Sequence, residues 1–204
     1  MPSACPSLPA IPSGAIETGA SLIDVDADGS LDTVRSYTAS SSPGAGDWHL
    51  RVELAGGGGD DLTLPFDPAP AGVEVLGGAY IGSTVDPGPE GTRPAIFTTV
   101  GAGASATIIG LYRLVGCDLQ SMGEEFPVGG GVMHTEHLRC EGVAGTSLLV
   151  YITTQYDDVA DQHEITNAAY SRVDNTLVLQ MSSIRIEPTL PTFDLIENCG
   201  NVSL

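Results

Sequence analysis

The residues best suited to chemistry in this sequence lie in one short acidic segment, which runs from Asp24 to Asp32 (DVDADGSLD). Aspartates occupy its positions 1, 3, 5 and 9, and Gly29 at position 6 permits a sharp turn. Ca²⁺ takes about six to eight oxygen ligands, and alternate residues of a tight loop can direct their side chains toward one ion. The spacing therefore predicts a calcium site. Its predicted ligands are the side chains of Asp24, Asp26, Asp28 and Asp32 and the carbonyl oxygen of Ser30.

The residues around this loop distinguish it from a helical EF-hand. Position 12, where an EF-hand carries a bidentate glutamate, is Arg35 in this chain. The flanking residues 21–23 and 33–37 favour strands instead. We therefore expect a loop between two strands, in which the cation would fix the loop and the strand register. A solvated acidic turn that holds no ion is the alternative.

A second acidic group occurs at residues 155–164. Its aspartates could ligate a weaker second cation, although a solvated loop between strands is the favoured interpretation. The candidate ligands are Asp157, Asp158 and Asp161.

No motif in the sequence predicts catalysis, so no catalytic residue is assigned. His134, Glu136 and His137 lack the H-E-x-x-H spacing of a zinc site and are predicted to lie on a surface strand. Ser105 is not part of a G-x-S-x-G nucleophile motif. The four glycines at 56–59 precede aspartates and not lysine, which predicts a flexible hairpin tip rather than a phosphate-binding loop. A binding module is therefore favoured over an enzyme.

The elements that must position these residues are predicted to be strands throughout. The 26 glycines and 14 prolines separate short apolar runs, several of which alternate apolar with polar residues. Trp48 begins one of these runs and is predicted to pack in the core, with stacking on a sugar as the alternative. The predicted strands cover residues 31–37, 48–54, 62–66, 73–81, 95–100, 107–115, 148–154, 177–181 and 183–186.

These strands fall into three similar units of roughly fifty-five to sixty residues, a pattern typical of a repeat. In each unit a strand is followed by a hairpin, and such a sheet buries its face only by stacking on its neighbour. After an extended lead-in at residues 1–20, we predict one all-β domain over residues 21–204. Its three propeller-blade-like antiparallel β-meander repeats would cover approximately 21–72, 73–131 and 132–190. A β-sandwich with three unrelated hairpins is the alternative.

The charge of the chain excludes some partners. It has 26 acidic residues against seven basic ones, all of them arginine, and a formal net charge of −19. Phosphate backbones and anionic lipid would repel such a protein, so we expect no nucleic-acid partner. No apolar run reaches the length of about 18 residues that a transmembrane helix needs.

The four cysteines, Cys5, Cys117, Cys140 and Cys199, are widely spaced and form no C-x-x-C motif. Their even number in an acidic β protein predicts two disulfides and an oxidising compartment, so the protein is expected to be secreted or on the cell surface. The favoured pairing joins Cys117 to Cys140 across a short loop and Cys5 to Cys199 at the two ends. Four free thiols are the alternative. Residues 3–5 also resemble the end of a bacterial lipoprotein signal, which would anchor the protein through a lipid on Cys5.

The acidic loop at 24–32 runs into a β-type strand and resembles the FG-GAP/VCBS repeats of integrin-like β-propellers and of many bacterial surface proteins. Residues 100–105, 111–114 and 126–130 also resemble actinobacterial secreted proteins with VCBS-like repeats, so the resemblance spans roughly residues 20–186. In that family the loop binds Ca²⁺ and lies between strands of one blade. The resemblance implies a secreted, calcium-stabilised binding or adhesion-type module.

The second and third units depart from this loop pattern. Residues 79–94 offer only Asp86 and Glu90, and residues 140–147 offer only Glu141, so these units are predicted to hold no calcium. The partner of such a module would be a protein or a carbohydrate, and self-association is a further expectation. A secreted hydrolase on a calcium-stabilised β scaffold is the alternative function.

Overall fold

A computed structural model describes residues 5–44, 46–65, 72–86, 88, 91–102, 105–131 and 133–202 of the chain. These residues form two sheets of mostly antiparallel strands and contain no helix, which confirms the all-β prediction. No helix long and apolar enough to cross a membrane occurs in this part of the chain.

The first sheet, sheet A, is a four-stranded antiparallel meander in which each strand pairs with the next along the chain. Apolar and polar residues alternate, so Val34, Leu50 and Val52 are fully buried on one face. Trp48 is buried in the same cluster, as predicted. The strands of sheet A are β1 (Ile16–Ile23), β2 (Asp32–Thr38), β3 (Trp48–Glu53) and β4 (Gly59–Thr63).

The second sheet, sheet B, contains the remaining strands. Its members are β5 (Val75–Ala79), β6 (Gly82–Ser83), β7 (Ala95–Ala102), β8 (Ala106–Val115), β9 (Asp118–Gly130), β10 (His134–Val143), β11 (Thr146–Asp157), β12 (Gln162–Val173), β13 (Thr176–Glu187) and β14 (Ile196–Glu197). Its main path runs β13-β12-β11-β10-β9-β8-β7-β5, so most strands lie beside their neighbours in sequence. The short strands β6 and β14 pair with β11 and β10.

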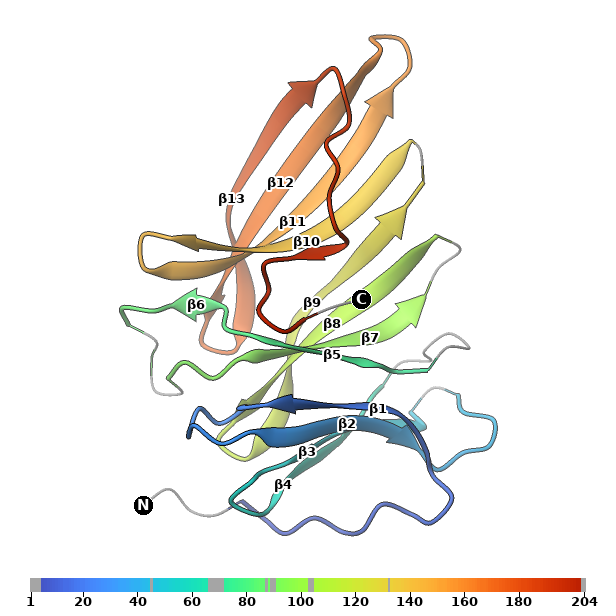
Figure 1. Cartoon of the computed structure of the whole chain (residues 1–204), viewed down its shortest axis with the longest axis vertical. Helices are drawn as coiled ribbons and strands as arrows, with labels where there is room; N and C mark the ends of the chain where they lie inside the picture. The colour runs from blue at the N-terminus through green and yellow to red at the C-terminus, as the bar shows by residue number, and fades with distance from the viewer. Residues whose placement is uncertain are drawn as a thin grey trace.

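Sheet B has a narrow junction between β9 and β10. Only Gly129 and Gly130 of β9 pair with β10, opposite Glu136 and Thr135. Beyond this point β10 pairs in parallel with β14 instead. The junction divides sheet B into a lower half, β5 and β7–β9, and an upper half, β10–β13 (Figure 1).

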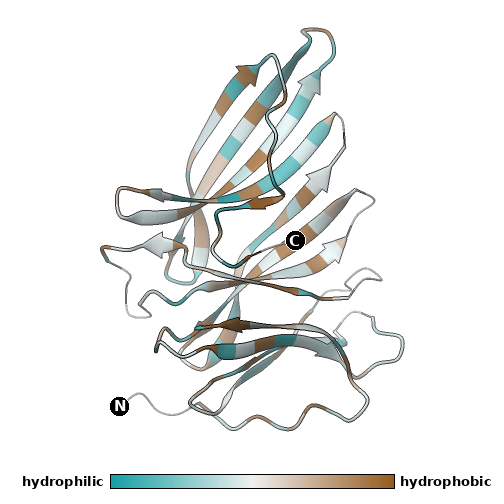
Figure 2. Cartoon of the chain, viewed as in Figure 1, coloured by the Kyte–Doolittle hydropathy of each residue, from teal (hydrophilic) through white to brown (hydrophobic). Residues whose placement is uncertain are grey.

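Apolar residues, brown in Figure 2, gather in three buried clusters. The first joins sheet A to the lower half of sheet B, the second joins the two halves of sheet B to the end of the chain, and the third lies on β11 and β12. The described residues thus form packed sheets and no closed barrel or propeller, so the predicted blades are not confirmed. The first cluster includes Trp48 and Ile96, the second includes Phe97 and Leu149, and the third includes Ile152 and Ile165.

The strand boundaries in sheet A differ from the predictions at two places. Residues 16–20 of the predicted lead-in belong to β1, which pairs with β2 along its whole length. The strand predicted at 62–66 is β4, which begins earlier, at Gly59; Phe66 lies outside the described residues. Both segments are rich in glycine, serine or aspartate, which favour turns in isolation, but pairing with a neighbouring strand overrides that preference.

The glycine run at 56–59 ends the β3–β4 hairpin, but only its first half is open as a flexible tip would be: Gly56 and Gly57 have free space around them, whereas Gly58 and Gly59 are closely packed. A side chain at Gly58 would overlap the carbonyl of Cys5, and one at Gly59 would overlap the carbonyl of Val52. The N–H of Gly59 also donates a hydrogen bond to the carbonyl of Pro6 (3.1 Å). The glycines therefore allow the N-terminal segment to cross this hairpin at backbone contact.

The four cysteines form two disulfides, as predicted, but in a different pairing. Cys5 is bonded to Cys117 and Cys140 to Cys199, with Cα–Cα distances of 5.4 and 4.9 Å. The short-loop pairing is wrong because Cys117 lies in the β8–β9 turn, at the end of β9 that is distant from β10, whereas Cys140 lies on β10 beside the end of the chain. The sulfur of Cys5 is engaged in its disulfide, so it is not free to carry the lipid that we considered.

Candidate functional site

The acidic loop connects β1 to β2, whose last pair is Ile23 with Asp32. Val25 points into the core and is completely buried, which fixes the start of the loop. The backbone then turns through positive φ angles at Ala27 (59°) and Gly29 (92°). Gly29 adopts such a conformation readily, whereas Ala27 has to be held there by its surroundings.

Three of the four aspartates of the loop converge. Carboxylate oxygens of Asp24, Asp26 and Asp28 all lie within 4.8 Å of one another. Asp24 accepts hydrogen bonds from the N–H groups of Asp28 and Gly29, both at 3.0 Å, and Asp28 accepts one from Ser30 at 2.7 Å. These bonds hold the side chains inside the loop, where they can offer oxygen atoms to a hard cation.

Asp32, the fourth predicted side-chain ligand, has a different environment. Its side chain is buried, with 1% of the residue exposed. One carboxylate oxygen accepts the N–H of Val25 and the other accepts the N–H of Ala55, each at 2.8 Å. Asp32 therefore ties the acidic loop to the β3–β4 hairpin and is not one of the three converging carboxylates.

The negative charges in the loop repel one another. Partial burial, followed by the charge of Asp32, raises the pKa of Asp26 above its ordinary value of 3.8. A raised pKa means that the folded state binds this proton more tightly than the unfolded state does. Asp26 therefore contributes stability at low pH, and this contribution is lost as the pH rises through the raised pKa. A bound cation would remove this penalty at neutral pH.

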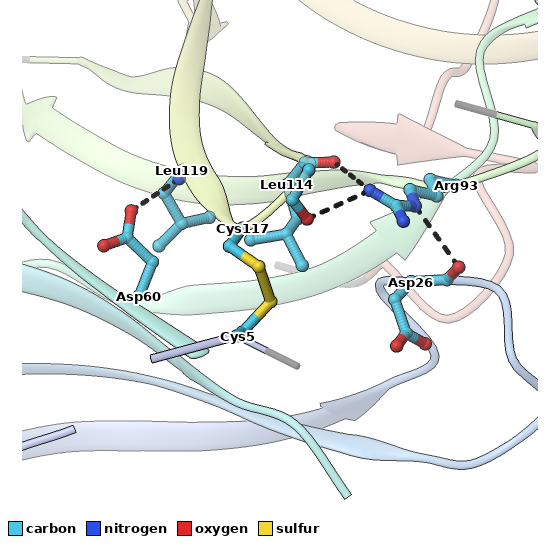
Figure 3. Close-up of a disulfide and its surroundings, with 8 residues drawn as sticks. Cys5, Asp26, Asp60, Arg93, Leu114, Cys117 and Leu119 are labelled. Atoms are coloured by element: carbon cyan, nitrogen blue, oxygen red, sulfur yellow. Dashed lines mark hydrogen bonds between the residues drawn. A yellow bond between two sulfur atoms is a disulfide. The ribbon is translucent and has the colours of Figure 1, made fainter. Parts of the chain in front are cut away.

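The loop is connected to sheet B through Arg93, which sequence reasoning did not identify (Figure 3). The Nε of Arg93 donates to the carbonyl of Asp26 (3.2 Å), and its Nη1 donates to the carbonyls of Leu114 (3.3 Å) and Gly116 (3.2 Å). Those two carbonyls lie beside the β8–β9 turn that holds Cys117. No pattern around residue 93 distinguishes this arginine from the six others.

The same turn is fixed from its other side. Asp60 of β4 accepts the N–H of Leu119 at 2.6 Å, and Cys117 is bonded to Cys5 (Figure 3). The acidic loop, the disulfide and the β8–β9 turn thus form one junction between sheet A and the lower half of sheet B. The acidic loop therefore takes part in the contact between the sheets.

The second acidic group lies at the β11–β12 turn and shows no such convergence. Asp157 accepts the N–H groups of Val159 (3.0 Å) and Ala160 (3.1 Å), and Asp161 accepts the hydroxyl of Tyr156 (2.7 Å). Among the described residues, the converging group is the one at Asp24, Asp26 and Asp28. A hollow of about 380 Å³ beside the turn is lined by Gln155, Tyr156, Asp157, Asp158 and Glu164.

The predicted surface strand at residues 134–137 is the start of β10, but it is not wholly on the surface. His134 is half exposed and lies 3.2 Å from the carboxylate of Glu136. His137 is buried on the other face, because the end of the chain covers it there. Its burial lowers the pKa of its imidazole below 6.5.

A polar network on the outer face of sheet A was also not predicted. Asp61 accepts hydrogen bonds from the hydroxyl of Tyr37 (2.8 Å) and from Arg51 (3.0 Å), and it contacts Nδ1 of His49 (2.9 Å). Burial and the hydrogen bond to Asp61 raise the pKa of Tyr37 to about 12. His49 and Arg51 alternate with core residues along β3, and this pattern could have indicated a polar face. On that face Arg51 and Asp61 are directly opposed on neighbouring strands.

Ser105, which we did not assign to catalysis, is exposed. It lies at a hollow of about 270 Å³ whose lining includes no histidine or acidic residue.

Comparisons of the chain with protein-family models, curated proteins and solved structures give no match.

Proposed function

We propose that this protein is a secreted or cell-surface, calcium-stabilised binding or adhesion-type module. One Ca²⁺ would be held by Asp24, Asp26 and Asp28. The observation that carries this proposal is the convergence of three carboxylates within 4.8 Å in one short loop. An all-oxygen donor set suits a hard cation, and carbonyls and water would complete its coordination.

The position of the loop supports a stabilising role for the ion. Asp26 contributes a side chain to the converging group and its carbonyl to Arg93, so a cation held by the loop would fix the junction between the two sheets. The two disulfides fit an oxidising environment and support secretion. The proposed ligand is a protein or a carbohydrate bound on the rigid β surface.

The proposed relationship to FG-GAP/VCBS repeats has one supporting feature. Sheet A is a four-stranded meander, and its acidic loop lies between the first two strands, as in a blade of that family. The continuous strand path of sheet B has no corresponding loop among its described residues. We therefore restrict the proposed relationship to residues 16–63.

Thermal unfolding with about 1 mM calcium or with chelator tests the cation site. We expect calcium to raise the melting temperature of the disulfide-intact protein, because a ligand at 100 times its Kd stabilises the native state by about 2.7 kcal/mol. An Asp24→Asn, Asp28→Asn double variant should lose the effect. An Asp157→Asn, Asp158→Asn double variant is the matched control and should keep it. If chelator leaves the wild type unchanged, the calcium proposal is wrong.

A further inference from the structure

The last described residues form a strap across the upper half of sheet B, and we call residues 188–202 the C-terminal strap (Figure 1). Its short strand β14 pairs with β10, and the N–H of Leu138 donates to the carbonyl of Leu195 at 2.9 Å. The Cys140–Cys199 disulfide fastens its far end. In the middle, the ring of Phe193 packs on the third apolar cluster, whose buried members are Leu148, Val150, Ile152, Ile165 and Ala169.

One buried histidine joins the middle of the strap to β10. His137 is only 7% exposed, and its ring lies against Phe193 with centroids 4.9 Å apart. Nδ1 lies 3.2 Å from the carbonyl of Asp194, which can only accept, so Nδ1 carries the proton. Nε2 then accepts from the hydroxyl of Thr135 at 2.9 Å. Both ring nitrogens are therefore satisfied by a neutral imidazole.

The charged groups around this ring come from β10 and from the strap. Glu136 and Glu197 act on His137 through their charges and favour its protonation. Glu197 also accepts the N–H of Asp194, and Glu136 accepts the hydroxyl of Tyr151. Arg139, two residues further along β10, is paired with Glu141. β11 contributes the uncharged Thr154, which is hydrogen-bonded to Thr135.

We propose that the C-terminal strap is an acid-released cover, in which protonation of His137 frees residues 190–196 from β10 while the Cys140–Cys199 disulfide keeps the end of the strap attached. A second ring proton would place a positive charge on a side chain that is buried between β10 and the strap. Opening the strap would return the charged ring to water and uncover the apolar residues beneath Phe193. This device is independent of the calcium loop, which lies in sheet A.

The direction of the pH effect follows from burial. In the closed form, loss of solvent lowers the pKa of His137, and the hydrogen bond to the carbonyl of Asp194 and the charges of Glu197 and Glu136 only partly offset this. The open form has the ordinary value of about 6.5 and so binds the proton more tightly. Closure is therefore favoured above that pH and weakens as the pH falls. Each unit between the two pKa values changes the opening equilibrium tenfold.

Hydrogen exchange of the whole, disulfide-intact protein at about pH 7.5 and about pH 5, corrected for the intrinsic rate, tests this proposal. We expect residues 190–196 and the amide of Leu138 to lose protection at the lower pH, by up to about tenfold if the pKa difference is one unit. Residues 199–202, near the disulfide, should stay protected. The fluorescence of an apolar dye should rise in parallel.

A His137→Gln variant should remove the pH dependence, because glutamine keeps a donor and an acceptor but does not titrate. His134→Gln, on the exposed face of the same strand, is the matched control and should retain it. Should the first variant fail to fold, NMR titration of the wild-type His137 ring gives its pKa directly. Equal strap protection at both pH values in the wild type, or a ring pKa at or above 6.5, would overturn the proposal.

Discussion

At the scale of single residues, identical side chains in one loop have two different roles. Asp24, Asp26 and Asp28 lie at partly or fully exposed positions and each place a carboxylate oxygen within 4.8 Å of the others, whereas Asp32 is buried and accepts N–H groups from Val25 and from Ala55 of the neighbouring hairpin. The first group can gain a cation or remain solvated. Removing the carboxylate of Asp32 would leave the backbone N–H groups of Val25 and Ala55 without their hydrogen-bond acceptors.

Replacing Asp32 by asparagine should therefore destabilise the fold with or without calcium. The side-chain NH₂ of asparagine would oppose one of the two backbone donors, and a buried unsatisfied donor costs about 1–3 kcal/mol. Urea unfolding in the presence of chelator measures this loss. Asp28→Asn, at an exposed position of the same loop, is the control and should change stability by less than about 0.5 kcal/mol. Equal stability of Asp32→Asn and the wild type would contradict the structural role.

The sequence spacing could predict that an oxygen-rich loop forms, but it could not separate these roles. One of the two donors to Asp32 comes from residue 55, which reaches the loop only because the β3–β4 hairpin folds beside it. The contact of Arg93 with Asp26 spans 67 positions and leaves no local pattern. Side chains were thus predictable where their partners are neighbours in sequence, and not where a distant element supplies the partner.

At the scale of elements, backbone contact between the N-terminal segment and the β3–β4 hairpin depends on glycine. Gly58 has a φ of +77° and faces the carbonyl of Cys5 without room for a Cβ. Gly56, in the same run, has open space around its Cβ position. Four consecutive glycines are therefore not equivalent.

Gly58→Ala should destabilise the protein, whereas Gly56→Ala should be tolerated. The first change combines a left-handed backbone with overpacking, each of which costs about 1–3 kcal/mol. The second should stay within about 0.5 kcal/mol of the wild type. Urea unfolding compares the two, and mass spectrometry of free thiols reports whether the Cys5–Cys117 disulfide still forms. Similar losses for both variants would show that the crossing does not restrict the backbone.

Strands with clear alternation, such as β3 and β8, were predictable from the sequence. β1 and β4 were less so, because the residues at their ends are typical of turns and the neighbouring strand decides their structure. The disulfide pairing was not predictable, since it depends on which distant segments the fold brings beside Cys117 and Cys140.

At the scale of the whole molecule, the net charge of −19 acts on every packed surface. Self-repulsion destabilises a compact state, and salt screens it with a Debye length of about 10 Å at 0.1 M. The two halves of sheet B are joined by the two residue pairs between β9 and β10, by the pairing of β6 with β11, by a disulfide-fastened strap and by shared apolar packing.

Raising sodium chloride from about 0.02 to about 0.3 M in chelator should raise the melting temperature at pH 7, because more of the repulsion is then screened. Scanning calorimetry measures the shift. The same salt step near the isoelectric point of about 4.1 is the control, and there the shift should largely disappear. A shift of the same size at both pH values would show that net charge does not limit stability.

The disulfide connectivity also determines how the folded chain bears a pulling force. Between Cys5 and Cys199 the covalent path crosses from Cys5 to Cys117, follows the backbone to Cys140 and crosses to Cys199. Only these 23 backbone steps (140 − 117) can be drawn out while both bonds are intact, a length of about 80 Å at about 3.4 Å per residue. Sheet A, β5–β8 and the β11–β13 meander lie inside covalent loops that carry no tension. Under load the molecule would therefore extend by a short tether made of β9 and the start of β10, with most of the fold preserved on either side.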